Sequence, residues 1–266
     1  MARARELGIH VDVSDVLDLV RYDGHPVLKG RVFPSLSAVA ERLCDDKVAT
    51  KAVLAAAGVP VPPAFGDRLV VKPRKGTHGE GVSLNLLPSE VAAASAGLGD
   101  VLVEGMCPGA DLRLQAVGGQ LVAACQRQPP SILGDGRSVA ELVEEVRTRV
   151  LRDNPTNALV VTRALPNVLS VGQVFVLNPT SNMSTGGLAV DVEPHPDWAE
   201  LVETVGRALD IAVFAVDAMT PDITCSWRDL GAVLEVNARP EWMHHTFSTG
   251  RQHDLPRMLL EDLLQA

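Results

Sequence analysis

Hydrophobic residues along this chain gather in short runs, most of them at the spacings of strands or of amphipathic helices. Runs rich in valine and leucine that end at a polar residue or a glycine predict strands. The expected strands are residues 68–73, 82–86, 101–104, 112–117, 121–126, 159–163, 173–177, 211–218 and 232–237. Apolar residues three and four positions apart predict helices. The expected helices are residues 36–44, 46–57, 89–96, 139–150, 198–209 and 255–264.

The N-terminal residues predict a short strand-rich start. Apolar residues alternate with polar ones at Ile9, Val11 and Val13, and an Asp23-Gly24 turn separates two further expected strands. Over the whole chain, strands and helices mix without a regular alternation. This order predicts an α+β fold with largely antiparallel sheets.

The composition is that of an ordinary globular protein. The chain has 266 residues, of which 46% are hydrophobic and 21% charged, so it is long enough for one large domain or two small lobes. Only 3% of the residues are aromatic, so the core must be built from leucine, valine and alanine. The net charge of −9 and the pI of about 5.2 argue against nucleic acid or an anionic membrane surface as the main partner.

Four widely spaced cysteines, Cys44, Cys107, Cys125 and Cys225, include no pair with the CxxC spacing. A zinc site or a disulfide framework is therefore not expected, and we interpret the cysteines as small buried residues of a reduced protein. No signal peptide is visible at residues 1–15, and no apolar run is long enough to cross a membrane. We therefore expect a cytoplasmic protein without a membrane partner.

Two oxygen-bearing side chains interrupt the last expected strand. Glu235 and Asn237 are two positions apart, so in a strand they point to the same face. Such a pair suits Mg²⁺, and Asp217 of the preceding strand would join it if the two strands pair antiparallel. The alternative is a strand end at which Glu235 is solvated and Asn237 begins a turn. His244 and His245 follow; such pairs are more often solvated than catalytic, although a loop over the site would also explain them.

A strand that ends with Lys72 and Pro73 runs into the loop RKGTHGEG, which contains Gly76, Gly79 and Gly81. Glycines let backbone amides approach an anion closely, and a lysine beside them adds a fixed positive charge. This combination favours a phosphate site, although no GKS or GKT follows, so the loop is not a Walker A motif. The alternative is a glycine-rich surface hairpin with an exposed lysine.

Acidic and basic residues also follow the third expected strand. Glu104 precedes a Pro-Gly turn, and Asp111 and Arg113 begin the next strand. A hinge of this kind can offer a backbone amide and a carboxylate to a purine edge and a second carboxylate to a ribose; the alternative is a solvated loop. Arg127 ends a hydrophobic strand, and the small-residue loop NMSTGG at residues 182–187 suits either an anion or a plain turn.

Taken in order, these stretches resemble the ATP-grasp superfamily. The closest likeness is to the ATP-grasp portions of cyanophycin synthetases and of bifunctional glutamate–cysteine ligase/glutathione synthetases. The resemblance covers roughly residues 36–265 and is carried by seven stretches, at residues 45–62, 70–82, 103–117, 127–144, 182–192, 209–217 and 234–245. Each stretch is modest alone, but all of them in the family's order are specific.

The resemblance implies the ATP-grasp fold, in which two α+β lobes with antiparallel sheets grip a nucleotide. It implies a short strand-rich segment on the substrate side at residues 1–35 and an ATP-grasp domain at residues 36–266. Within that domain, a small nucleotide-binding lobe would span about 64–105 and a larger catalytic lobe about 106–266.

The same resemblance implies a role for each matched residue. The lysines would contact the nucleotide phosphates, the glycine-rich loop would be the lid over them, and the acids at the hinge would lie near adenine and ribose. The implied nucleotide-binding residues are Lys47, Lys72, Gly76, Thr77, His78, Gly79, Gly81, Glu104, Gly105, Met106 and Asp111. The residues implied near the transferred phosphoryl group and the acyl intermediate are Arg113, Arg127 and Asn182, and the implied metal ligands are Asp217, Glu235 and Asn237.

The implied cofactors are ATP and Mg²⁺, with two magnesium ions, or manganese in their place. The implied reaction is the ligation of two amino acids: a carboxylate becomes an acyl phosphate, and an amine then attacks it to form an amide. A γ-glutamyl dipeptide is the expected product. The alternatives are a catalytically silent ATP-grasp module that binds nucleotide or a partner, and phosphotransfer to a non-carboxylate acceptor. Amino acids are the expected partners, and a homodimer is one expected assembly.

Two features depart from the family pattern. Glu241 stands where a glycine is usual after the Asn-Ala of the metal strand, which leaves the amine substrate open. The N-terminal region is also shorter than in relatives, and no further ligase module is visible. The short N-terminal region and the lack of a visible further module favour a compact enzyme that forms one amide bond over a processive polymerase.

Overall fold

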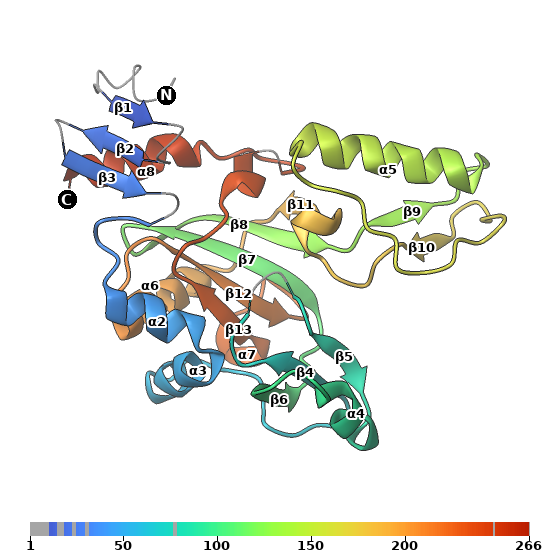
Figure 1. The fold of residues 1–266 in the computed structure, drawn as a ribbon, viewed down its shortest axis with the longest axis horizontal. Helices are drawn as coiled ribbons and strands as arrows, with labels where there is room; N and C mark the ends of the chain where they lie inside the picture. The colour runs from blue at the N-terminus through green and yellow to red at the C-terminus, as the bar shows by residue number, and fades with distance from the viewer. Residues whose placement is uncertain are drawn as a thin grey trace.

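A five-stranded antiparallel sheet lies at the centre of the molecule (Figure 1). The computed structural model describes residues 11–14, 19–22, 25–29, 32–76, 79–246 and 248–265. The strands of the central sheet, in spatial order, are β11 (Leu188–Asp191), β8 (Gln120–Gln128), β7 (Ala110–Val117), β12 (Phe214–Thr220) and β13 (Ala232–Asn237). Each neighbouring pair is antiparallel, so the predicted α+β fold with antiparallel sheets is confirmed.

One face of the central sheet is apolar and is covered by three helices, α2 (Ala38–Asp45), α3 (Lys47–Ala56) and α6 (Asp197–Leu209). Side chains alternate between the two faces of a strand, and even-numbered residues of β7, β8 and β12 point to the helices. These buried residues are Leu112, Leu114, Ala116, Ala124, Phe214, Val216 and Ala218. The odd-numbered residues of the same strands therefore point away from the helices, and they include the predicted site residues Asp111, Arg113, Arg127 and Asp217.

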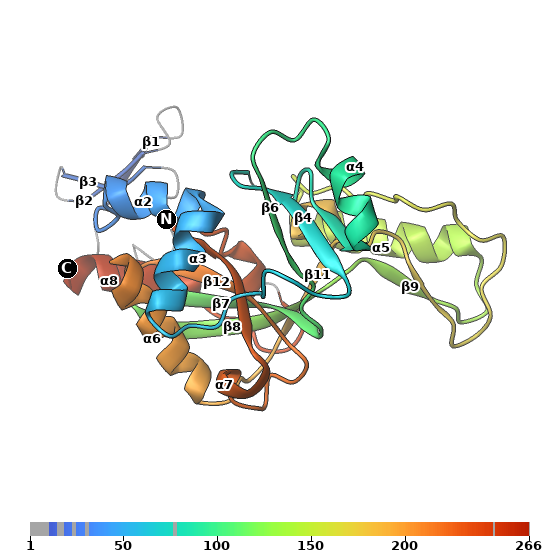
Figure 2. The ribbon, with the colours of Figure 1, turned by 90° about the horizontal axis from the view of Figure 1, so that it is seen from below.

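A second, smaller sheet carries the glycine-rich loop. In it β4 (Leu69–Pro73) lies between β5 (Ser83–Leu86) and β6 (Val101–Gly105), and η1 (Pro88–Glu90) and α4 (Val91–Ser95) connect the outer strands. Figure 2 shows this sheet beside the central one. Arg74, just after β4, forms an ion pair of 2.6 Å with Asp46, the N-cap of α3, so the small sheet is fastened to the helical layer.

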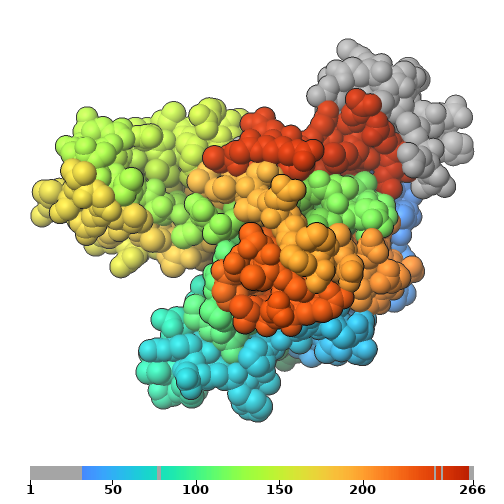
Figure 3. Space-filling view, turned by 180° about the vertical axis from the view of Figure 1, so that it is seen from behind, coloured from blue at the N-terminus to red at the C-terminus, as the bar shows by residue number. Residues whose placement is uncertain are grey.

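The residues between β8 and β11 form a third lobe with a small core of its own. It contains β9 (Ser131–Leu133), α5 (Val139–Asp153), β10 (Val174–Val176) and the turn η2 (Met183–Thr185). A capping box of Ser138 and Glu141 starts α5. The core residues are Ile132, Val139, Leu142, Val143, Leu169 and Leu177. Figure 3 shows this lobe and the lobe of β4–β6 as separate masses that project from the central sheet.

Most predicted elements are present, with two kinds of error. The expected strand at 159–163 is wrong, because its residues make isolated hydrogen bonds, from Val160 to Thr185 and from Thr162 to Leu177, and form no ladder. Its apolar residues pack against the small core instead. The short strands β9 and β11 and the helix α7 (Trp227–Leu230) were not expected.

The two ends of the described chain complete the fold. β1 (Val11–Ser14), β2 (Leu19–Tyr22) and β3 (His25–Lys29) form an antiparallel sheet, as the sequence predicted, whereas Ile9, Asp23 and Gly24 lie outside the described residues. The C-terminal part contains η3 (Met243–Thr246) and α8 (Leu255–Gln265). No helix in the described ranges combines the length and the apolar character needed to cross a lipid bilayer. The expected boundaries of the lobes stay a prediction.

Candidate active site

Five side chains form one row across the face of the central sheet that points away from the helices. Strand register places Glu235 of β13 opposite Asp217 of β12, and Asp217 opposite Arg113 of β7. It also places Arg113 opposite Cys125 of β8, and Cys125 opposite Asp191 of β11. Directly opposed residues of antiparallel strands point to the same face, with Cα atoms about 4.5–5.5 Å apart. This polar row therefore takes one residue from each strand of the sheet.

Asp217, the second residue of the polar row, is only 2% exposed. The Arg113 guanidinium donates from Nη1 to both carboxylate oxygens of Asp217, at 2.9 and 3.1 Å, and Arg127 Nη2 lies 3.4 Å from Oδ1. Burial opposes the charge of Asp217, but Arg113 and Arg127 outweigh it, so the pKa of Asp217 lies below its usual value. Asp217 is therefore held as a carboxylate.

Glu235 and Asn237 meet Asp217 as the sequence predicted for antiparallel pairing. Burial, followed by the charge of Asp217, raises the pKa of Glu235, and the two carboxyl groups are within hydrogen-bonding reach. Asn237 Nδ2 donates to Asp217 Oδ2 at 3.2 Å, which leaves the amide oxygen of Asn237 for another partner. Two close acids share a proton unless a cation compensates them. This donor set of hard oxygens fits Mg²⁺, although the metal role itself stays a prediction.

A second pair of charges lies next to the polar row. Arg127 donates to Asp111 Oδ1 from Nη2 at 2.6 Å and from Nε at 3.1 Å. Burial raises the pKa of Asp111, and Arg127 limits the rise. Arg113 and Arg127 thus converge on Asp217 from neighbouring strands, as a pair of guanidinium groups beside two acids. In the structure Asp111 is bound to Arg127. The predicted contact of Asp111 with a ribose stays a prediction.

Three buried charges join the small sheet to α3. The Glu104 carboxylate of β6 forms ion pairs with both Lys72 of β4 and Lys51 of α3. Lys72 is only 7% exposed, so the alternative of an exposed surface lysine is wrong. Burial, followed by the charge of Lys72, lowers the pKa of Lys51 to about 8, and Glu104 limits the fall. Two ammonium groups against one carboxylate leave a net positive charge, which suits the oxygens of a phosphate.

Lys51 was not singled out from the sequence, although a signal for it was present. Lys47 and Lys51 are four residues apart on α3, and this spacing places them on one face of the helix. Lys47 Nζ donates to the Gly76 carbonyl at 2.8 Å and lies 3.6 Å from Glu235 Oε2. Lys47 therefore links the glycine-rich loop to the acid pair of the central sheet.

The glycine-rich loop and the hinge are described in part. Gly76, Gly79 and Gly81 have φ of 148°, 73° and 69°, a backbone that favours glycine, whereas Thr77 and His78 lie outside the described residues. At the hinge, the N–H groups of Gly105 and Met106 donate to the carbonyls of Pro63 and Arg68, at 2.6 and 2.9 Å. These two amides are therefore engaged within the protein, and the Glu104 carboxylate is engaged by the lysines. Their predicted contacts with adenine are not shown.

Asn182 lies in the loop before β11. Its side-chain oxygen accepts from the N–H and the hydroxyl of Ser184, at 3.1 and 3.0 Å, and so caps η2. Arg149 of α5 donates to the carbonyls of Gly186 and Gly187 and holds the same loop. These contacts explain the shape of the loop, and a catalytic role of Asn182 stays a prediction.

The segment after Asn237 folds back over the polar row. The Glu241 carbonyl accepts a hydrogen bond of 3.4 Å from Arg113 Nη2, so the residue that replaces the usual glycine reaches the site through its backbone. His244 and His245 are 3% and 0% exposed, so the expectation of a solvated pair is wrong. Burial is the main cause that lowers the pKa of both histidines, that of His245 to about 3, and keeps them neutral.

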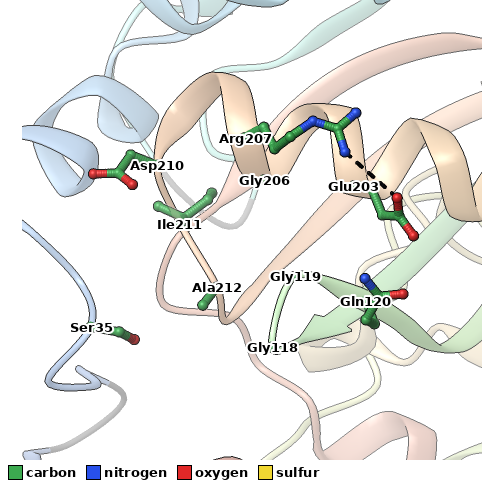
Figure 4. Close-up of a pocket in the computed structure, with 10 residues that line it drawn as sticks. All are labelled: Ser35, Gly118, Gly119, Gln120, Glu203, Gly206, Arg207, Asp210, Ile211 and Ala212. Carbon is green, nitrogen blue, oxygen red and sulfur yellow. Dashed lines mark ion pairs between the residues drawn. The ribbon is translucent and has the colours of Figure 1, made fainter. Parts of the chain in front are cut away.

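A surface pocket shown in Figure 4 is separate from the polar row. It lies between the end of α6 and the turn of Gly118 and Gly119 that joins β7 to β8. Two of its charged residues, Glu203 and Arg207, pair with each other at 3.6 Å, and Asp210 also lines it. The pocket is on the helical side of the central sheet, and the polar row is on the other, so we assign it no part in the site.

Comparison with known proteins tests the resemblance. No protein-family model matches the chain. The cyanophycin synthetase of Crocosphaera subtropica is 30% identical over 84% of this chain and 31% of its own length. That of Nostoc sp. is 34% identical over 76% of this chain and 27% of its own length. The glutathione biosynthesis bifunctional protein GshAB of Mannheimia succiniciproducens is 27% identical over 93% of this chain and 39% of its own length. The chain therefore spans only about a third of these relatives.

Solved structures give the same result for the fold. A bifunctional glutathione synthetase from Pasteurella multocida has a TM-score of 0.71 at 25% identity, over 98% of this chain and 43% of that one. A D-alanine–D-alanine ligase from Bacillus anthracis has a TM-score of 0.55 at 14% identity, over 85% of this chain and 68% of that one. The ATP-grasp ligase PsnB has a TM-score of 0.55 at 12% identity, over 97% of this chain and 85% of that one. The chain therefore has the ATP-grasp fold and resembles the ATP-grasp ligases, among them cyanophycin synthetase and GshAB.

Proposed function

We propose that this chain is an ATP-dependent carboxylate–amine ligase, which joins two amino acids through an acyl phosphate and releases ADP and phosphate. The observation that carries the proposal is the polar row. Two guanidinium groups meet an acid pair there, and Lys47 connects that pair to the glycine-rich loop. The names of the relatives, cyanophycin synthetase and glutathione biosynthesis protein, support amide-bond formation.

The lysines are proposed to bind the phosphates of ATP. Lys51 and Lys72 share the single carboxylate of Glu104, so one positive charge is left to pair with a phosphate group while Glu104 holds both lysines in place. Lys47 holds the first glycine of the loop and is close to the acid pair. Phosphoryl transfer depends mainly on such positioning and charge neutralisation.

Asp217, Glu235 and Asn237 are proposed to hold Mg²⁺. The support is the set of hard oxygen atoms that meets there, two neighbouring carboxyl groups and the amide oxygen of Asn237, which is the kind of ligand that Mg²⁺ prefers. When bound, the ion would neutralise phosphate oxygens of the nucleotide. Arg113 and Asn237 hold the Asp217 carboxylate in a fixed orientation for this purpose.

Arg113 and Arg127 are proposed to act on the acyl donor. Their guanidinium groups orient its carboxylate, whose oxygen attacks the γ-phosphorus while ADP leaves with the bonding electrons of the broken P–O bond. The amine of the second substrate then attacks the acyl carbon, and Arg127 neutralises the tetrahedral oxyanion. Phosphate leaves with the electrons of the C–O bond, and the nitrogen loses a proton, so the products are an amide, ADP and phosphate.

Glutamate is the proposed acyl donor, and a γ-glutamyl dipeptide the proposed product. The support is the likeness to GshAB, a protein of glutathione biosynthesis, over 93% of this chain. The amine substrate would lie beside residues 239–245, where the chain departs from the family pattern at Glu241.

The test is a reaction with ATP, MgCl₂ and pooled amino acids, followed by measurement of ADP, of free phosphate and of products by mass spectrometry. The proposal expects ADP and phosphate in equal amounts together with a dipeptide. Arg113→Lys should lower the rate of product formation about 100-fold, since lysine keeps the charge but loses the planar fork that binds the Asp217 carboxylate and the Glu241 carbonyl together. The matched control is Arg207→Lys at an exposed position, with no change.

Two results would contradict the proposal. ATP binding without turnover of any amino acid would favour a silent ATP-grasp module. ADP without free phosphate would favour phosphotransfer to an acceptor that keeps the phosphoryl group.

A further inference from the structure

Three buried side chains with metal-binding atoms converge at the far end of the polar row from Glu235. Cys125 belongs to the row, next to Arg113, and His244 and His245 of η3 lie over it. The Cys125 sulfur and one ring nitrogen of each histidine all lie within 4.8 Å of one another. None of these residues is more than 3% exposed.

The ring nitrogens of this cluster are unsatisfied. Both nitrogens of His244 and both of His245 are buried and have no hydrogen-bond partner among the described residues. The two rings instead face each other, with centroids 4.4 Å apart and planes tilted by 40°. A buried polar atom without a partner costs about 1–3 kcal/mol, so native proteins normally satisfy such atoms with protein, water or an ion. The cluster therefore has the form of a site that takes a ligand.

The chain around η3 is anchored so that the two histidines keep this position. Thr249 N donates to the Ala189 carbonyl at 2.9 Å, and Asp191 N donates to the Thr249 carbonyl at 2.8 Å, which fastens the segment to β11. His253 N donates to the His245 carbonyl at 2.9 Å, and the His253 ring bonds Asp191 at 2.7 Å. These contacts fix the backbone of the segment that contains His244 and His245.

We propose that Cys125, His244 and His245 bind one transition-metal ion of the zinc class. Thiolate sulfur and neutral imidazole nitrogen are the ligands that zinc prefers, whereas Mg²⁺ prefers oxygen. Tetrahedral zinc places its ligand atoms about 3.4 Å apart, so modest side-chain rotations close this site. The Cys125 thiol loses its proton to solvent when the S–Zn bond forms, and a water molecule takes the fourth position.

The ion would tie η3 to β8 and so fix the segment that contains Glu241. The Glu241 carbonyl is hydrogen-bonded to Arg113, so the metal would stabilise the position of that arginine from the side opposite to Asp217. This site uses none of the residues proposed for Mg²⁺ or ATP. Its existence is therefore independent of the ligase proposal.

The test measures metal bound by the full chain. The chain is loaded with ZnCl₂ and dialysed against metal-free buffer. Inductively coupled plasma mass spectrometry should then find about one zinc per chain. Co²⁺ in place of Zn²⁺ should give the intense visible bands of a tetrahedral site and a thiolate-to-cobalt band in the near ultraviolet. Cys125→Ser should abolish the thiolate band, and both Cys125→Ser and His245→Gln should lower zinc to below about a tenth of an equivalent.

The matched controls are Cys225→Ser and His195→Gln, which change the same residue types outside the cluster and should retain the metal. Circular dichroism checks that each variant folds. If Cys125→Ser does not fold, the cobalt spectrum of the wild-type chain shows whether a thiolate binds the metal. The proposal is overturned if the loaded chain holds less than about a tenth of an equivalent and shows no thiolate band. It is also overturned if folded Cys125→Ser and His245→Gln keep their zinc.

Discussion

The ion pair between Arg113 and Asp217 offers a direct test of the polar row. Asp217 is 2% exposed, and its contacts with Arg113, at 2.9 and 3.1 Å, are shorter than those with Arg127 and Asn237. Arg113→Ala leaves the carboxylate buried with two weaker donors, Arg127 at 3.4 Å and Asn237 at 3.2 Å, beside the Glu235 carboxyl. Removing one partner of a buried pair costs about 3–5 kcal/mol. Because two weaker partners remain, we expect a loss near the lower end, about 3 kcal/mol of the free energy of unfolding.

A double-mutant cycle separates this pair from its surroundings. Arg113→Ala, Asp217→Ala and the double variant are unfolded with urea, and the coupling energy is obtained from the three differences in the free energy of unfolding. We expect about 2–3 kcal/mol, because the double variant no longer buries an unpaired charge. The coupling should change little between low and high salt, since buried charges are poorly screened.

The matched control is the exposed pair of Arg137 and Asp135. Its charged atoms are closer, at 2.7 Å, but its side chains are 47% and 41% exposed. Exposed pairs contribute about 0–1 kcal/mol, and salt weakens them. A coupling of Arg113 with Asp217 that is no larger than the control value would refute the argument that burial makes the polar row strong.

Glu235→Gln should raise the melting temperature of the metal-free protein at neutral pH, because it removes a buried carboxyl that Asp217 repels. Because the pKa of Glu235 is raised in the folded protein, the wild type loses stability as the pH rises from the usual glutamate pKa to the pKa of the folded protein. Calorimetry below this window should therefore show no gain in melting temperature for Glu235→Gln. A gain that does not depend on pH would contradict the assignment. Magnesium competes with the same proton, so calorimetric titration should find a higher affinity for Mg²⁺ at the upper end of this window and none for Glu235→Gln. ATP affinity should fall as the pH rises through about 8, where Lys51 loses its charge. Lys51→Met should weaken ATP binding about tenfold and remove this pH dependence. Arg207→Met is the control, and an equal loss of ATP affinity in it would show that the effect is not local.

The part of the site that the sequence predicted is the part that local geometry determines. Asp217, Glu235 and Asn237 lie on strands that are consecutive in the sheet, and a period of two together with antiparallel pairing is enough to bring them together. Gly118 and Gly119, with φ of 59° and 74°, likewise set the hairpin of β7 and β8 through a turn that requires positive φ at both positions. Such features follow from neighbours in the chain.

The contacts that were not predicted join segments far apart in the sequence. Arg113 lies opposite Asp217 because β7 pairs with β12, strands that are separated by a whole lobe, and no local pattern fixes that register. The same holds for the ion pair of Lys51 with Glu104, which joins a helix to another sheet. The cysteines gave no reason to expect a zinc-type cluster, since its residues come from β8 and from η3, which are far apart in the sequence.

Arg113 takes part in two contacts between distant segments. Its Nη1 holds the Asp217 carboxylate, and its Nη2 holds the Glu241 carbonyl of the segment that leads to His244. A planar guanidinium cannot move toward one partner without leaving the other. The acid pair proposed for Mg²⁺ and the segment that departs from the family pattern are therefore geometrically coupled. Substitutions at residues 239–245 that shift the backbone should act on the acid pair through Arg113, even where their side chains contact neither substrate.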